Sequence, residues 1–141
     1  GEHGDSEIAV WSSANVSGIP IDDFCEMRGH YDHVQAMRQI AENVKNSAYE
    51  IIARKQATYY GIAMSVKRIC EVIVRDEKSI LPISTMIHDE YGIDDIALSM
   101  PAIVGGEGVE THVPISLNKQ ETESLIDSAE TLKKVAKELE L

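Results

Sequence analysis

The sequence predicts an α+β domain in which long helices pack on an antiparallel or mixed β-sheet and a further helix ends the chain. Three observations predict it. Apolar residues recur every three or four positions through two long segments near the middle. Short β-branched runs around a glycine-rich turn follow these segments. The last segment begins with a helix-capping pattern. Helices followed by consecutive strands, rather than alternating with them, are typical of α+β folds.

Two helices are expected in the first half. The first begins near Asp32, and its apolar stripe consists of Val34, Met37, Ala41, Val44, Ala48 and Ile51. Gln56-Ala57-Thr58 interrupts the pattern, and a second stripe follows at Ile62, Val66, Ile69 and Ile73. We expect both stripes to lie in the core.

Strands are expected next, before a final helix. The first covers Ile80 to Ile87, and Ile96–Val104 and Val109–Leu117 flank a glycine-rich hairpin turn. Pro101 and Pro114 favour edge strands or bulges, because proline donates no ladder hydrogen bond. Asn118, with Glu121 three residues later, forms a capping box. The helix that follows has its stripe at Leu125, Ala129, Leu132, Ala136 and Leu139.

Length and charge exclude several classes of protein. The chain has 141 residues, as expected for one domain, and its net charge is −11. Such a charge repels phosphate backbones and anionic lipid, so neither nucleic acid nor membrane is an expected partner. Cys25 and Cys70 form no CxxC pair, which favours buried thiols in a reducing compartment, and no targeting segment is visible. We therefore expect a cytoplasmic protein.

His3 is the first candidate for chemistry. Histidine titrates near neutral pH, and Gly4 beside it allows the backbone to approach a ligand closely. A histidine in a loop without a role is the alternative. Thr58 lies where the first helix is expected to break, so its hydroxyl and methyl groups could face a cleft, or it could simply cap the next helix.

A metal site is the competing interpretation for the histidines. His30 and His33 have ligand-like spacing, and Cys25 and Asp32 lie nearby. No second anchoring pair accompanies them, so we interpret both histidines as surface residues that precede the long helix, and we predict no metal. No GxGxxG follows a strand, so no dinucleotide-binding fold is expected in this chain.

The residues also resemble a known family. Gly1-Glu2-His3-Gly4-Asp5-Ser6-Glu7 is similar to the catalytic-histidine signature of the NAD-dependent L-lactate dehydrogenases, a bacterial type within the lactate/malate dehydrogenases. The resemblance continues in order along the chain, through Ser47–Ile52, Ala57–Ala63, Pro82–Ile87, Tyr91–Ile93, Leu98–Gly105 and Ser128–Leu132. It implies the C-terminal, substrate-binding domain over residues 1–141.

The resemblance implies roles for three residues. His3 would protonate the keto oxygen of pyruvate, Thr58 would lie beside the substrate methyl group, and Ile62 would pack near the nicotinamide ring of NAD. The family commonly has glycine where this chain has Gln56. If that position required a positive φ, glutamine would cost about 1–2 kcal/mol.

The same resemblance implies a fragment. The NAD-binding Rossmann domain, the arginines for the substrate and the aspartate that orients the histidine would all precede Gly1, so we expect the isolated chain to be inactive and to need its N-terminal half. A homotetramer is expected from the family. Two alternatives remain open: a malate or branched 2-hydroxy-acid dehydrogenase, and a non-catalytic assembly module.

Overall fold

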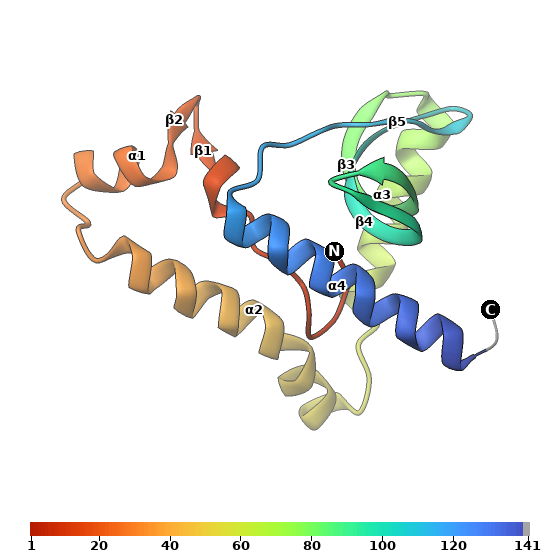
Figure 1. Ribbon diagram of the computed structural model, residues 1–141, viewed down its shortest axis with the longest axis horizontal. Coiled ribbons are helices and arrows are strands. Elements are labelled where there is room, and N and C mark those ends of the chain that lie inside the picture. Colours follow the sequence, from red (N-terminus) through yellow and green to blue (C-terminus); the bar gives the residue numbers. More distant parts are fainter. Residues whose placement is uncertain (140–141) are drawn as a thin grey trace. The chain divides into compact units, whose positions relative to one another are not determined.

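A computed structural model describes residues 1–139 (Figure 1). The chain has an α+β architecture, as predicted, with the element order of helices, antiparallel strands and a final helix. It divides into two compact units. The first comprises Gly1–Ser47 and Ile115–Leu141, and the second comprises Ala48–Pro114. The helix α2 begins in the first unit and ends in the second, and each unit is described by itself below.

The first unit begins with small elements that the sequence pattern did not predict. A short 3-10 helix, η1, spans Trp11–Ser13, and a hairpin follows with strands β1 (Asn15–Val16) and β2 (Ile19–Pro20). Ser17 and Gly18 both have positive φ in its turn, which matches the twist of two-residue hairpins. Helix α1 (Ile21–Met27) then begins directly after Pro20, with two aspartates in its first turn. At seven residues it is too short to give a clear apolar period.

Helix α2 spans His33–Lys55 and confirms the first predicted helix. The predicted apolar stripe of α2 is, however, not buried along its whole length. His33 and Met37 are its buried residues, whereas Val34 is 51% exposed and Val44 is 57% exposed. An apolar stripe indicates that a helix has a face suited to packing. Whether that face is buried depends on which elements of the described chain lie against the helix.

The second unit contains helix α3 and a three-stranded antiparallel sheet. Helix α3 spans Tyr60–Arg75, and the strands are β3 (Ser79–Glu90), β4 (Ile93–Gly105) and β5 (Gly108–His112), in the order β3-β4-β5. The predicted glycine-rich hairpin is confirmed by the pairing of Gly105 with Gly108. The second predicted strand of this hairpin is shorter than expected, because β5 ends at His112.

Pro101 lies in the central strand, so the expectation of an edge position was wrong. It pairs with Pro82 of β3. Two prolines opposite each other cannot exchange N–H···O bonds, so this pair occupies a position whose amide nitrogens face away from the partner strand. On the other side of β4, Pro101 accepts a hydrogen bond from the Val113 backbone N–H at 2.8 Å but cannot donate one in return. The ladder with β5 accordingly ends at the pairing of Ala102 with His112.

The core of the second unit lies between α3 and the sheet. Val72 is fully buried against β4, together with Ile87, Leu98, Ala102 and Val104. The predicted stripe of α3 is only partly correct, because Ile62 is 56% exposed and Val66 is 51% exposed. The less exposed residues of α3 lie in its last two turns. There Val72 is fully buried, whereas the predicted Ile69 and Ile73 are only half-buried.

Helix α4 returns to the first unit and spans Lys119–Glu138. The predicted capping box is present: the Asn118 side chain accepts from the Glu121 backbone N–H, and the Glu121 side chain accepts from the Asn118 backbone. Leu125 and Ala129 of the predicted stripe are buried. This end of the fold was thus predictable from a local hydrogen-bonding pattern.

Two further features concern the surface. Cys70 is exposed and Cys25 is half-buried, so the expectation that both thiols are buried was wrong. Cys70 lies on the exposed face of α3, opposite to the face that Val72 buries.

Within residues 1–139, no helix is both long and apolar enough to cross a membrane.

Candidate functional site

His3 lies in a turn of the first unit, and its side chain is exposed. The residues around it are bound to helix α4. The backbone N–H of Glu2 donates to Ser128 Oγ at 2.8 Å, and the hydroxyls of Ser6 and Ser128 lie 3.0 Å apart. Ser128 is fully buried. The turn is thus held from both sides of the histidine while the imidazole faces outward.

Glu2 and Gly4 explain the shape of this turn. The hydroxyl of Ser6 donates to the Glu2 carboxylate, and the backbone N–H of Glu7 donates to the Gly4 carbonyl at 3.0 Å. The Glu2 side chain folds over Gly4, where an added Cβ would lie 2.7 Å from its Oε1. A larger residue at Gly4 would displace the end of the flexible Glu2 side chain from this position.

A second contact holds the following segment to α4. The backbone N–H of Ser12 donates to Glu121 Oε1 at 3.0 Å, and the Ser12 hydroxyl donates to the same carboxylate. Burial by itself would raise the pKa of Glu121, but the hydrogen bonds from Ser12 and Asn118 outweigh it and hold the pKa below its ordinary value. Glu121 therefore caps α4 and also fixes the segment that follows His3.

Thr58 and Ile62 lie in the second unit. Thr58 occupies the break between α2 and α3, as predicted, and is exposed. The N-cap of α3 is Tyr59, without a side-chain capping bond, so the alternative in which Thr58 caps the helix does not apply. Within residues 1–139 the Thr58 hydroxyl has no hydrogen-bond partner. Ile62 follows one helical turn later, so both side chains are available to a ligand.

Gln56, which stands where the family commonly has glycine, adopts a positive φ. Its φ is 65°, immediately after the last residue of α2. Its backbone N–H donates to the Ile52 carbonyl at 2.7 Å, which ends the helix in a left-handed cap. The chain thus takes a path toward Thr58 that glycine would follow without steric cost.

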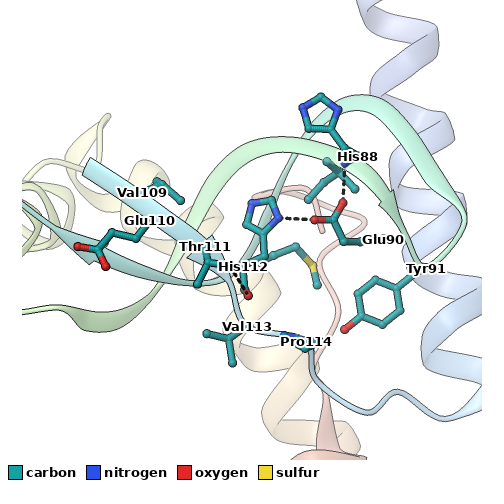
Figure 2. A pocket seen from close by; sticks show the side chains of 11 residues that line it. His88, Glu90, Tyr91, Val109, Glu110, Thr111, His112, Val113 and Pro114 are labelled. Carbon is teal, nitrogen blue, oxygen red and sulfur yellow. Dashed lines mark hydrogen bonds and ion pairs between the residues drawn. The ribbon is translucent and has the colours of Figure 1, made fainter. Parts of the chain in front are cut away.

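The second unit also contains a pocket that the sequence did not predict. It has a volume of about 560 Å³ and lies between the far end of β3 and strand β5 (Figure 2). Its walls are largely apolar, and its polar groups come from both strands. The lining residues include Ile87, Glu90, Met100, Val109, His112 and Pro114.

A hydrogen-bonded chain forms the polar side of this pocket. His112 Nδ1 lies 2.5 Å from Glu90 Oε1, and His112 Nε2 bonds the hydroxyl of Thr85. The backbone N–H of His88 donates to the second carboxylate oxygen of Glu90 at 2.5 Å. The bond from His112 lowers the pKa of Glu90, and the bond from His88 adds to this effect, against an opposing contribution from burial.

Sequence reasoning missed this chain because its members are far apart and belong to no motif. Glu90 and His112 are separated by 22 positions and lie at the ends of different strands. The only signal is that Glu90 follows the predicted strand Ile80–Ile87 and that His112 lies within the predicted strand Val109–Leu117. Even a correct register would not place them together, because β3 and β5 are not neighbours in the ladder.

The predicted surface position of His33 was wrong. His33 is 9% exposed, its Nε2 lies 3.1 Å from Asp22 Oδ1, and its Nδ1 lies 2.8 Å from the His30 carbonyl. Both ring nitrogens are thereby engaged in joining α1 to the start of α2. In the part of the chain that the structure describes, no group of three or more His, Cys, Asp or Glu side chains could hold a metal ion.

Comparison with known proteins identifies a family. The family model of the lactate/malate dehydrogenase α/β C-terminal domain matches residues 1–140. An L-lactate dehydrogenase of Clostridium botulinum (strain 657 / Type Ba4) is 52% identical over 133 residues, which are 94% of this chain and 42% of that protein. One from Acetivibrio thermocellus is 45% identical over 141 residues, which are 100% of this chain and 44% of that protein.

Solved structures agree with these relatives. The minor L-lactate dehydrogenase of Enterococcus mundtii, in its ligand-bound form, superposes with a TM-score of 0.89 and 44% identity, over 96% of this chain and 43% of that chain. A lactate dehydrogenase from a Medee basin deep-sea metagenome library has a TM-score of 0.92 and 38% identity, over 100% of this chain and 45% of that chain. The chain therefore spans less than half the length of these relatives.

Proposed function

Because the chain belongs to the lactate/malate dehydrogenase family through its α/β C-terminal domain, we propose that it is the substrate-binding part of an NAD-dependent L-lactate dehydrogenase. The complete enzyme would interconvert pyruvate and L-lactate. The observation that carries this proposal is the 52% identity to an L-lactate dehydrogenase across 94% of the chain. The lactate dehydrogenase name recurs for the other relatives and for the solved structures described above.

His3 is proposed as the acid and base of the reaction. As an imidazolium it donates a proton to the keto oxygen of pyruvate, and as a neutral imidazole it takes the proton from the lactate hydroxyl. The bound nicotinamide cofactor supplies hydride to the carbonyl carbon or accepts it. The exposure of His3 supports this role, and so do the contacts of its neighbours with Ser128, which leave the ring free to reach a ligand.

Thr58 and Ile62 are proposed as binding residues. The methyl and hydroxyl groups of Thr58 would line the space for the substrate methyl group, and the exposed Ile62 would offer an apolar surface to the planar nicotinamide ring. A side chain that is exposed and without a structural partner is open for such a contact. The exposure of Thr58 and Ile62 therefore supports binding roles.

The substrate carboxylate requires a cation, and we propose that it comes from the part of the enzyme outside the matched segment. The chain itself has a net charge of −11, which opposes binding of an anion. Charge-assisted bonds from arginine fix a carboxylate in two-point geometry, and their loss costs both affinity and orientation. We therefore expect the 141-residue chain to show no turnover by itself.

The test is NADH oxidation with pyruvate, measured on the chain alone and after mixing with the separately expressed remainder of the Clostridium botulinum relative. Binding of the two parts is checked by size-exclusion chromatography. We expect no activity alone and activity on mixing, which His3→Gln abolishes. His30→Gln is the matched control, because it removes an exposed imidazole outside the proposed site.

Two results would overturn the proposal. Full activity of the mixture containing His3→Gln would exclude His3 as the proton donor. A stable, bound mixture without any turnover would favour an assembly module over a catalytic part. A preference for oxaloacetate or branched 2-oxo acids over pyruvate, measured as kcat/KM in the same mixture, would instead reassign the substrate within the family.

A further inference from the structure

The contact between His112 and Glu90 joins the two outer strands of a three-stranded sheet. The strand order is β3-β4-β5, so β4 separates the two strands along the ladder. His112 on β5 nevertheless bonds both Glu90 and Thr85 on β3. This geometry requires the sheet to curl, and Figure 2 shows β3 bending around to meet β5. Register shifts after Ile87 and after Ile103 are consistent with that curvature.

The hydrogen-bonding capacity of the three side chains determines how they respond to protons. The Glu90 carboxylate only accepts, so His112 Nδ1 donates to it in either charge state of the ring. The Thr85 hydroxyl donates to Nε2 when the ring is neutral and accepts from it when the ring is charged. Both bonds are therefore possible with the ring in either charge state. Protonation of Glu90 removes the carboxylate charge and leaves a neutral carbonyl oxygen, which is a weaker acceptor for His112 Nδ1.

We propose that Glu90, His112 and Thr85 form a latch that holds the curled sheet closed around the pocket and that opens when Glu90 is protonated. The pocket depends on this closure, because Glu90 and Tyr91 reach it from β3 and its turn while Val109 and His112 reach it from β5. Among residues 1–139, the backbone of β5 pairs with β4, and Glu110 of β5 is also paired with Lys78. Loss of the latch therefore frees the last residues of β5 from β3.

Other charged groups around the latch do not duplicate its function. His88 lies beside Glu90 and bonds it through the backbone N–H, which does not titrate. Glu110 on β5 is paired with Lys78 Nζ at 3.1 Å. Asp94 on β4 accepts from the backbone N–H of Asp89 at 3.1 Å. Tyr91 also lines the pocket, from the turn after β3.

The test is amide hydrogen exchange of the 141-residue chain between pH 7 and about pH 2.5, a range that passes through the lowered pKa of Glu90, corrected for intrinsic exchange and read by mass spectrometry. In the wild-type chain, peptides covering β5 should keep their protection until Glu90 titrates and then exchange about tenfold faster or more. Glu90→Gln should show the faster exchange already at pH 7, without a further step. Glu107→Gln is the matched control, because it makes the same charge change in the exposed β4–β5 turn.

Thr85 provides a second test that does not change charge. Thr85→Val removes the hydroxyl at nearly constant volume and should accelerate β5 exchange, whereas Thr85→Ser should retain the protection of the wild-type chain. Peptides from α4 serve as the reference for folding in every variant. The proposal is wrong if β5 exchange in Glu90→Gln equals that of the wild type at pH 7, or if Thr85→Val and Thr85→Ser behave alike.

Discussion

The hydroxyl of Ser128 on α4 lies 2.8 Å from the backbone nitrogen of Glu2, 126 positions away in the sequence. The same oxygen lies 3.0 Å from the Ser6 hydroxyl. One buried side chain on a helix thus holds both sides of the turn that carries His3. Within the first unit, the position of the proposed proton donor is set by α4 as much as by the glycine-rich segment itself.

We predict that Ser128→Ala destabilises the chain by about 1–3 kcal/mol, because the Glu2 N–H would lose its acceptor in a buried environment. Urea unfolding followed by circular dichroism measures the change. Ser124→Ala is the matched control one turn earlier on α4, and it should change the free energy of unfolding by less than about 0.5 kcal/mol. Equal effects of the two substitutions would contradict a special role for Ser128.

Gln56→Gly is expected to raise the free energy of unfolding by up to about 1.5 kcal/mol. Relief of the left-handed conformation at φ 65° would contribute about 1–2 kcal/mol. The greater entropy of glycine in the unfolded chain offsets about 0.5–1 kcal/mol of this gain. Thermal or urea unfolding tests the balance. Gln56→Ala keeps the Cβ atom and should give no gain, so stabilisation by alanine would point to the glutamine side chain rather than to the backbone.

The pKa of Glu121 predicts a pH dependence of stability. Because its pKa is lowered in the folded chain, its ionised form contributes stability above its unfolded pKa, and this contribution is lost as pH falls through the folded pKa. Glu121→Gln should therefore reduce stability at pH 7 and flatten the acid side of the stability profile. Denaturant titrations from pH 7 to pH 3 measure both effects. A profile unchanged in shape would show that other carboxylates dominate acid unfolding.

Thr58 should separate function from folding. Its side chain is exposed and makes no hydrogen bond within residues 1–139, so Thr58→Ala should change the free energy of unfolding by less than about 0.5 kcal/mol. In the reconstituted assay the same substitution should lower kcat/KM for pyruvate. Thr58→Ser, which keeps the hydroxyl and removes the methyl group, distinguishes the two contributions. Unchanged kinetics in both variants would remove Thr58 from the proposed site.

The sequence by itself determined the features that depend on neighbouring residues. The two long helices, their break before Thr58 and the hairpin at Gly105–Gly108 follow from local periodicity and turn chemistry. The capping box at Asn118 is likewise complete within four residues. The resemblance around His3 depends on a contiguous motif. Such features can be predicted without knowledge of the fold, because the residues that interact in them are only one turn or one strand apart in the sequence.

Only the tertiary structure decided which apolar faces are buried and which distant polar groups meet. Val44 and Ile62 belong to clear stripes yet are exposed, because burial depends on the elements that pack against a helix. His33 is buried, and Asp22 and the His30 carbonyl bond its two ring nitrogens in place of water. Glu90 and His112 meet across a strand that separates them in the ladder, since the sheet curls. Such contacts depend on curvature and packing, which no local pattern in the sequence specifies.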